Sequence, residues 1–173
     1  MALKITLGVV AFVVLSAVVS FAAAYWYGSS LPEERVVSRT LFVNANPIDV
    51  YNLAVDIEGQ SSWRKDVLGI TVGSDKRSWV EHTKQGDVEF EITDVDAPHG
   101  FGLSLRGRGF HGKWAGTFTA SGSGTEVSLT EAISVKNPFF RLLSKMMKFS
   151  EKFMDAYAHE LKTEAERRHA EQG

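Results

Sequence analysis

The sequence predicts an α+β fold in which a curved, seven-stranded antiparallel sheet wraps around a long C-terminal helix, preceded by one transmembrane helix. Three observations lead to this prediction. Residues 5–27 carry no charge, seven segments alternate apolar and polar side chains, and apolar residues recur at helical spacing after Pro138. Alternation gives a sheet one apolar face that needs a cover, and the C-terminal helix is the one predicted element long enough to provide it.

The uncharged segment predicts a membrane anchor, assigned to residues 1–28, and a short polar linker follows at residues 29–34. As a helix, its 23 residues would span roughly 34 Å, enough to cross a hydrocarbon core of about 30 Å. The segment ends in Tyr25, Trp26 and Tyr27, whose rings suit the headgroup interface. A cleaved signal peptide is the alternative, but the apolar stretch exceeds the ~7–15 residues typical of one. We therefore expect a retained anchor.

The charges that flank the anchor do not decide its orientation. Lys4 precedes it, and Arg35 and Arg39 follow it together with two glutamates. So small a difference in basic residues is too weak for the positive-inside rule. Our default is a single-pass membrane protein that contacts the bilayer through residues 5–27, with the soluble domain outside the cytoplasm.

The soluble domain is expected at residues 35–168, with a frayed tail at residues 169–173. Asn46-Pro47 and Asn137-Pro138 each predict a helix start, because asparagine caps a helix and proline suits its first position. The first pair opens one of two small helices between strands 1 and 2, and the second opens a helix that continues to about Arg168. The strands are predicted at residues 35–44, 67–73, 76–84, 87–96, 101–108, 113–120 and 126–135.

Composition excludes several classes of function. The chain has no cysteine and a net charge of -2, so we expect no thiolate chemistry and no nucleic-acid partner. Its histidines lack the spacing of metal ligands, which predicts no metal and no cofactor. Residues 107–112 read GRGFHG, but a strand pattern follows where a dinucleotide site requires a helix. We interpret this run as a glycine-rich hairpin, with a flexible lid over a binding site as the alternative.

Two stretches resemble the START-like (SRPBCC) superfamily, in particular its polyketide cyclase/dehydrase and lipid-transport branch. They are NPIDVYNLAVDIEGQSSWRKDV at residues 46–67 and GTEVSLTEAISVKNPFFRLLSKM at residues 124–146. Pro47, Val50, Tyr51, Trp63 and Arg64 stand where that branch has its first-helix pattern. The resemblance covers residues 36–166 and implies a helix-grip fold. It also implies a deep apolar cavity, between the sheet and the long helix, that holds a lipid, quinone, polyketide or hormone.

Alternation and helical spacing select the side chains expected to line that cavity. Each could equally serve as core packing, but together they would give an adaptable wall for an apolar ligand. The candidates are Trp79, Phe90, Ile92, Phe101, Leu103, Trp114, Phe118, Leu129, Glu131, Met146, Phe153 and Tyr157.

Glu131 is the one acidic residue of this set and the only candidate for catalysis. It shares the inward row of its strand with Leu129 and Ile133, and a buried carboxylate must be paired or protonated. It could bind a ligand hydroxyl or act as an acid/base in a cyclase. The alternative is an internal ion pair, with Arg64 or Arg106 as partner.

A second feature of the C-terminal helix is a row of bases: Arg141, Lys145, Lys148 and Lys152. A solvated helix face explains such a row most simply. Near a bilayer it could instead contact anionic headgroups.

These features favour a monomeric, membrane-anchored domain that binds a hydrophobic small molecule or lipid. The first alternative is a cyclase- or aromatase-like enzyme, which the sequence favours less because Glu131 stands without a visible catalytic partner. The second is a regulatory or chaperone-like module, which an exposed apolar patch on the outer face of the sheet would favour.

Overall fold

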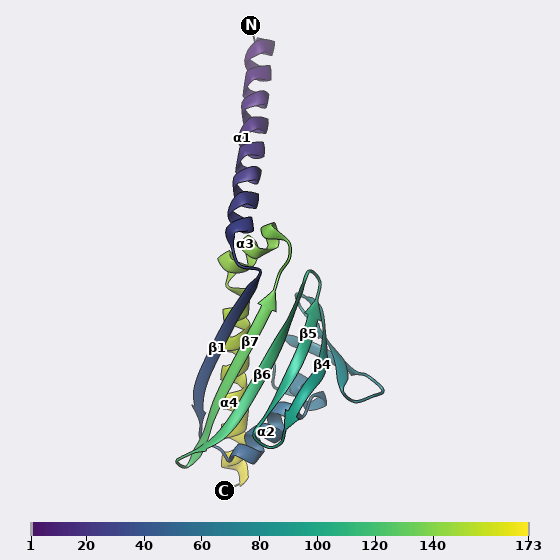
Figure 1. The fold of residues 1–173 in the computed structure, drawn as a ribbon, viewed down its shortest axis with the longest axis vertical. Coiled ribbons are helices and arrows are strands. Elements are labelled where there is room, and N and C mark those ends of the chain that lie inside the picture. Colours follow the sequence, from purple (N-terminus) through teal and green to yellow (C-terminus); the bar gives the residue numbers. More distant parts are fainter. Residues whose placement is uncertain (1, 173) are drawn as a thin grey trace.

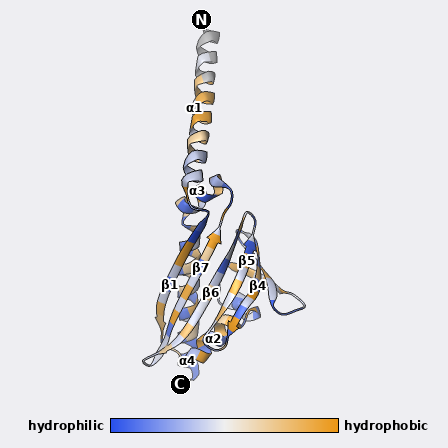
Figure 2. Ribbon diagram, in the orientation of Figure 1, coloured by the Kyte–Doolittle hydropathy of each residue, from blue (hydrophilic) through white to orange (hydrophobic). Residues whose placement is uncertain are grey.

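The computed structural model describes residues 2–172, and the side chains of residues 8, 10 and 12–172. Helix α1 (Ala2–Ser30) projects from a domain of one sheet and several helices (Figure 1). Its stretch Phe12–Ser30 is long and apolar enough to cross a membrane, and Figure 2 shows hydrophobic residues along its middle. The expected anchor at residues 5–27 falls within α1, although the side chains of residues 5–7, 9 and 11 lie outside the described part.

The sheet confirms the predicted architecture. Its seven strands have the order β1-β7-β6-β5-β4-β3-β2, and every neighbouring pair is antiparallel. Strands β2 to β7 therefore follow one another as hairpins, while β1 joins the far edge beside β7. Their bounds are β1 (Glu34–Val43), β2 (Val67–Val72), β3 (Ser78–Thr83), β4 (Gly86–Asp96), β5 (Gly100–Gly107), β6 (Phe110–Ser121) and β7 (Gly124–Ser134).

Two small helices connect β1 to β2, as predicted. Helix α2 (Pro47–Val55) starts at Asn46, whose side chain accepts a hydrogen bond from the Ile48 backbone N–H. The 3-10 helix η1 (Glu58–Ser62) follows after a short break. Val50 and Leu53 of α2 are buried against the core, so α2 closes one end of the sheet.

The predicted long C-terminal helix is confirmed as α4 (Phe149–Gln172), but its predicted continuity from Pro138 is wrong, because the structure contains two helices there. Helix α3 (Pro138–Met147) ends at Lys148, which adopts a left-handed conformation with φ 52°. Helix α4 then starts in a new direction and runs behind the sheet (Figure 1). It continues to Gln172, so residues 169–172 of the expected tail are helical, while residue 173 lies outside the described residues. Of these two helices, α4 covers the sheet, and α3 packs beside α1.

The glycine-rich run at residues 107–112 is a tight hairpin, as its sequence pattern favoured. Gly107 pairs with Phe110 at the end of the β5–β6 ladder, leaving two residues in the turn. One of them, Gly109, has φ 89°, a conformation that glycine adopts without steric cost. So short a turn has no length to form a lid.

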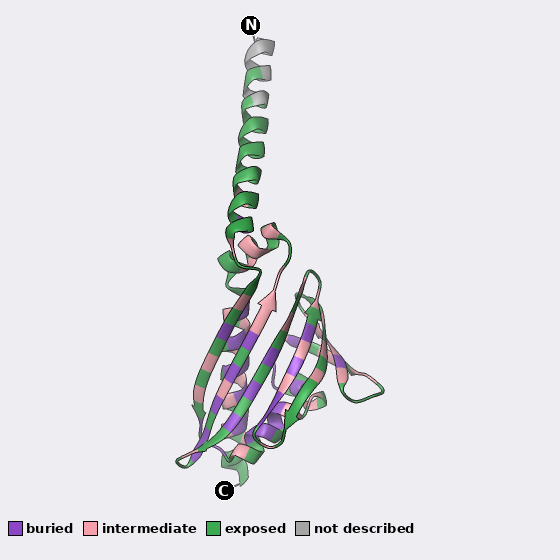
Figure 3. Cartoon of the chain, viewed as in Figure 1, coloured by how far each residue is buried: buried purple, intermediate pink, exposed green. Residues whose placement is uncertain are grey.

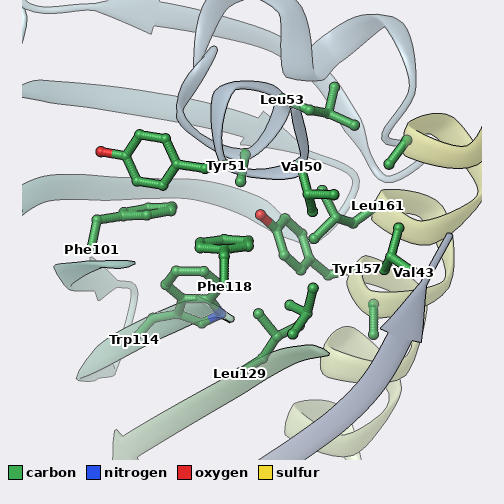
Figure 4. Close-up of a cluster of buried hydrophobic side chains, with 14 of the residues drawn as sticks. Val43, Val50, Tyr51, Leu53, Phe101, Trp114, Phe118, Leu129, Tyr157 and Leu161 are labelled. Carbon is green, nitrogen blue, oxygen red and sulfur yellow. The ribbon is translucent and has the colours of Figure 1, made fainter. Parts of the chain in front are cut away.

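The core lies between α4 and the face of the sheet that carries the alternating apolar residues. Figure 3 shows buried and exposed residues alternating along β6 and β7. Trp114, Phe118 and Leu129 point inward from these strands and meet Tyr157 and Leu161 of α4 (Figure 4). This one apolar layer fixes which face of the sheet is internal.

Candidate functional site

Four of the aromatic candidates, Phe101, Trp114, Phe118 and Tyr157, meet beneath α4. Phe101 lies 5.1 Å from Trp114 and 6.2 Å from Phe118 between ring centroids, and Trp114 meets Tyr157 edge-on at 5.6 Å. Tyr51 of α2 adds a further edge contact with Phe118 at 5.8 Å. Figure 4 shows these rings clustered between the strands and α4. Their contacts are those of a packed core.

The remaining candidates take three positions. Leu103, Leu129 and Glu131 are buried in the same inner layer. Trp79 and Phe90 stack with centroids 5.3 Å apart, and Phe90 and Ile92 are partly exposed at the margin of the core. Phe153 is half-buried on α4, where the Arg64 guanidinium carbon lies 5.7 Å from its ring centroid.

Met146 lies elsewhere. It belongs to α3 and is 72% exposed, so the expectation that it lines the space beneath the sheet is wrong. The physical reason is the break at Lys148. A continuous helix would have kept Met146 in line with the residues of α4.

Neither predicted partner of Glu131 pairs with it. Arg64 instead donates to Glu81 at 2.6 Å and to the Gln60 side chain at 2.7 Å, and the two charged side chains are 6% and 3% exposed. Trp79 also donates to Glu81, at 3.3 Å. Arg106 is exposed on the other face of the sheet. Glu81 was missed, although its alternation with Trp79 along one strand could have shown that it points inward.

Glu131 forms part of a polar cluster with Arg35, Ser150 and Glu151, which we call the Glu131 cluster. Arg35 of β1 pairs with Glu151 at the start of α4. Glu131 is only 4% exposed, and burial raises its pKa to about 7, an effect that the nearby Ser150 side chain opposes and the Glu151 charge reinforces. Loss of solvation disfavours the charged form. Glu131 is therefore a carboxyl that exchanges a proton near neutral pH.

A hollow of about 210 Å³ adjoins this cluster, and we call it the inner hollow. It lies where the connector from α1 meets the ends of β1 and β7 and the corner between α3 and α4. Apolar side chains and charged or polar side chains share its wall. The lining residues are Leu31, Pro32, Glu33, Arg35, Ile133, Val135, Arg141, Ser144, Lys145 and Ser150.

Two buried polar atoms beside the inner hollow lack a hydrogen-bond partner among the described residues. They are the Nε of Arg141 and the Oε2 of Glu151. The rest of the Arg141 guanidinium is occupied, since it donates to the backbone carbonyls of Leu31 and Lys136 at 2.8 Å and to Glu33 at 3.2 Å. Native proteins rarely leave buried polar atoms unpaired. Arg141 lines the inner hollow, while Glu151 follows the lining residue Ser150 in the chain.

A larger hollow of about 790 Å³ crosses β2 to β7, and we call it the outer hollow. Lys113, Ser104 and Ala132 border it, and along their strands these residues alternate with the buried Trp114, Leu103 and Glu131. The outer hollow thus lies mainly on the face turned away from α4. Its wall combines apolar residues such as Val72, Trp79 and Phe90 with a charged and polar set: Glu34, Glu89, Glu91, Arg106, His111 and Lys113.

None of the twelve predicted residues borders the inner hollow among the residues described, and Trp79 and Phe90 border the outer one. The predictions identified core residues, because a core side chain and a cavity-lining side chain would both lie on the inward face of the sheet. Arg35, Arg141 and Ser150 were missed as site residues. Arg35 and Arg141 contact segments more than 100 residues away, as in the pair between Arg35 and Glu151, and no local pattern marks such contacts.

Comparison with known protein families identifies the family to which this chain belongs. Residues 34–166 match the family described as polyketide cyclase / dehydrase and lipid transport. The match covers most of the chain, so the chain belongs to this family, whose fold is that of the START-like superfamily. A search of curated protein sequences gives no match.

Solved structures share the fold at low sequence identity. An aromatase/cyclase from Streptomyces sp. R1128, ZhuI, is 15% identical with a TM-score of 0.67, covering 78% of this chain and 95% of that one. A START superfamily protein from Mycobacterium smegmatis is 16% identical with a TM-score of 0.61, covering 76% and 97%. The di-domain aromatase/cyclase StfQ of the steffimycin pathway is 11% identical with a TM-score of 0.63, covering 78% of this chain. The chain spans 51% of StfQ, about half its length.

Proposed function

We propose that this protein is a membrane-anchored domain that binds a hydrophobic small molecule carrying a polar group, such as a lipid, a quinone or a polyketide-like compound. The inner hollow carries the proposal. Ile133 and Val135 give it an apolar wall, and Arg35, Arg141 and Lys145 give it charged groups. A mixed wall of this kind is typical of small-molecule sites. Membership in a cyclase and lipid-transport family supports this class of ligand.

The volume of the inner hollow limits what it can hold without movement. At about 210 Å³ it is smaller than the ~300–1,000 Å³ of sites for drug-sized ligands. A molecule of lipid size therefore requires the corner between α3 and α4 to move, or part of the ligand to remain outside. The corner is a single residue, Lys148, between two helices. In our proposal the anchor keeps this site beside the bilayer, with the domain on the extracytoplasmic side.

Native mass spectrometry of the full chain, purified from its own membrane, tests the proposal. Ile133→Trp would fill the inner hollow, and Ala132→Trp is a matched control because the adjacent residue borders the outer hollow. We expect a hydrophobic molecule to accompany the wild type and Ala132→Trp but to be lost from Ile133→Trp. Retention by both variants, or loss from Ala132→Trp alone, would contradict binding in the inner hollow.

A cyclase-like enzyme is the second candidate, because Glu131 has a pKa of about 7. A carboxyl with that pKa can serve as a general acid or base at neutral pH. Ser150 connects it to the wall of the inner hollow, so a bound carbonyl compound would lie near it. Turnover of the co-purified molecule or a related polyketone, lost in Glu131→Gln while binding persists, would favour the enzyme over the binding domain.

A further inference from the structure

Helix α3 is amphipathic, yet it buries none of its side chains in the domain. Five of its apolar side chains remain between 40% and 72% exposed, namely Phe139, Phe140, Leu143, Met146 and Met147, and Phe149 just after it is 46% exposed. The most exposed are Phe140 and Met146, at 51% and 72%. Exposed apolar patches of this kind mark contact with a partner or a membrane.

The position of α3 is fixed by α1 rather than by the sheet. Phe139 stacks on Phe21 with ring centroids 6.0 Å apart. A Cβ on Gly28 would lie 2.1 Å from the carbonyl oxygen of Pro138, so glycine allows the close approach of the two backbones. Lys145 donates to the Tyr27 hydroxyl at 3.1 Å. The two helices therefore share one level along the axis of α1.

That level is the membrane interface if α1 spans the bilayer. Tyr25, Trp26 and Tyr27 are 49%, 81% and 51% exposed at the end of α1 nearest the domain. Phe21, the partner of Phe139, precedes Tyr25 by four residues, about 6 Å of helix. The apolar side of α3 thus begins on the bilayer side of the aromatic belt, while Lys145 contacts the belt itself.

We propose that α3 is an interfacial helix that inserts its apolar side into the same leaflet that α1 enters. The occupant of its exposed face is lipid, because the face is continuous with the surface of the anchor. Interfacial helices lie with their apolar faces buried ~5–10 Å into the headgroup and acyl boundary, which agrees with the depth set by Phe21. Lys148 and Lys152, just beyond α3, are exposed and available to headgroup phosphates.

This inference extends the proposed function and rests on its membrane anchor. Arg141 and Lys145 belong to α3 and also line the inner hollow. Insertion of α3 would therefore place one wall of that hollow at the lipid surface. A hydrophobic ligand would then pass between bilayer and protein without crossing water.

The absence of cysteine allows a direct test in full-length protein. Met146→Cys is labelled with an environment-sensitive fluorophore, and the protein is reconstituted in phosphatidylcholine vesicles that contain spin-labelled lipid. Ser123→Cys, in the β6–β7 turn at the end of the domain far from α1 (Figure 1), is the matched exposed control. Val14→Cys, in the middle of α1, reports on the anchor.

We expect the probe at Met146 to be quenched roughly twofold more by a label near the headgroup than by one deep in the acyl chain, because interfacial helices lie at that depth. The probe at Ser123 should respond to aqueous iodide alone. Quenching at Val14 without quenching at Met146 would overturn the inference and leave the anchor intact. No lipid quenching at either position would contradict the anchor itself. Shielding of Met146 from both iodide and lipid labels would mean a protein partner, and would also overturn it.

Discussion

Replacement of Glu131 by glutamine should stabilise the protein at neutral and alkaline pH. Burial holds the pKa of this carboxyl at about 7 in the folded protein, against 4.5 for an ordinary glutamate. Below about pH 4.5 the carboxyl is protonated in both folded and unfolded chains, so its ionisation has no effect on stability. As the pH rises from there to about 7, the unfolded chain ionises first, and the folded state loses stability relative to it.

The expected change in the free energy of unfolding follows from the size of the pKa shift of Glu131. At about 1.4 kcal/mol per pKa unit, a rise from 4.5 to about 7 corresponds to a loss of about 3 kcal/mol above neutral pH. Glutamine has nearly the same shape and does not ionise. The difference in free energy of unfolding between Glu131→Gln and the wild type should therefore grow by about 3 kcal/mol between roughly pH 4 and pH 8.

Urea denaturation of the full chain in detergent micelles, followed by tryptophan fluorescence, measures this difference. Glu126→Gln is the matched control, because Glu126 is an exposed carboxylate on the same strand. It should change stability little at either pH. A difference for Glu131→Gln that stays constant with pH would refute the assignment of a raised pKa, and one that reverses sign would show that the folded state stabilises the ionised form.

Two further substitutions test the packing around the site. Arg64→Met should lower the free energy of unfolding by about 3–5 kcal/mol, because it leaves Glu81 buried without its partner. Adding Glu81→Leu to this variant should restore most of the lost stability. An unchanged urea midpoint in Arg64→Met would be inconsistent with a buried ion pair. Lys148→Gly should raise the melting temperature slightly, by the equivalent of about 1 kcal/mol, because glycine adopts the left-handed conformation at the α3–α4 corner more readily. A lower melting temperature would show that the lysine side chain stabilises that corner.

The strands and helix starts could be predicted because their signals are local. Alternation places Trp114 and Leu129 on one face whatever lies opposite them, and Asn46 and Asn137 each cap a helix through their own neighbouring backbone. The inward position of Glu131 followed from the same alternation. Its consequence, a raised pKa, follows directly from burial.

The break at Lys148 was missed because the apolar spacing continues across it. Met146 and Met147 keep the helical repeat, and neither proline nor glycine interrupts the chain there. The break shows only in where the two halves pack, α3 against α1 and α4 against the sheet. The local sequence does not show whether an apolar side chain packs against the sheet or against another helix.

The sequence by itself determined the strands, the starts of α2 and α3, the inner face of the sheet, the apolar N-terminal segment and the family. Tertiary structure alone decided that Arg64 pairs with Glu81, that Arg35 reaches Glu151, and that the smaller hollow opens beside α1. The reason is physical. Periodicity depends on the geometry of a few consecutive residues, whereas an ion pair or a hollow depends on the relative positions of segments that meet only after the whole sheet has formed.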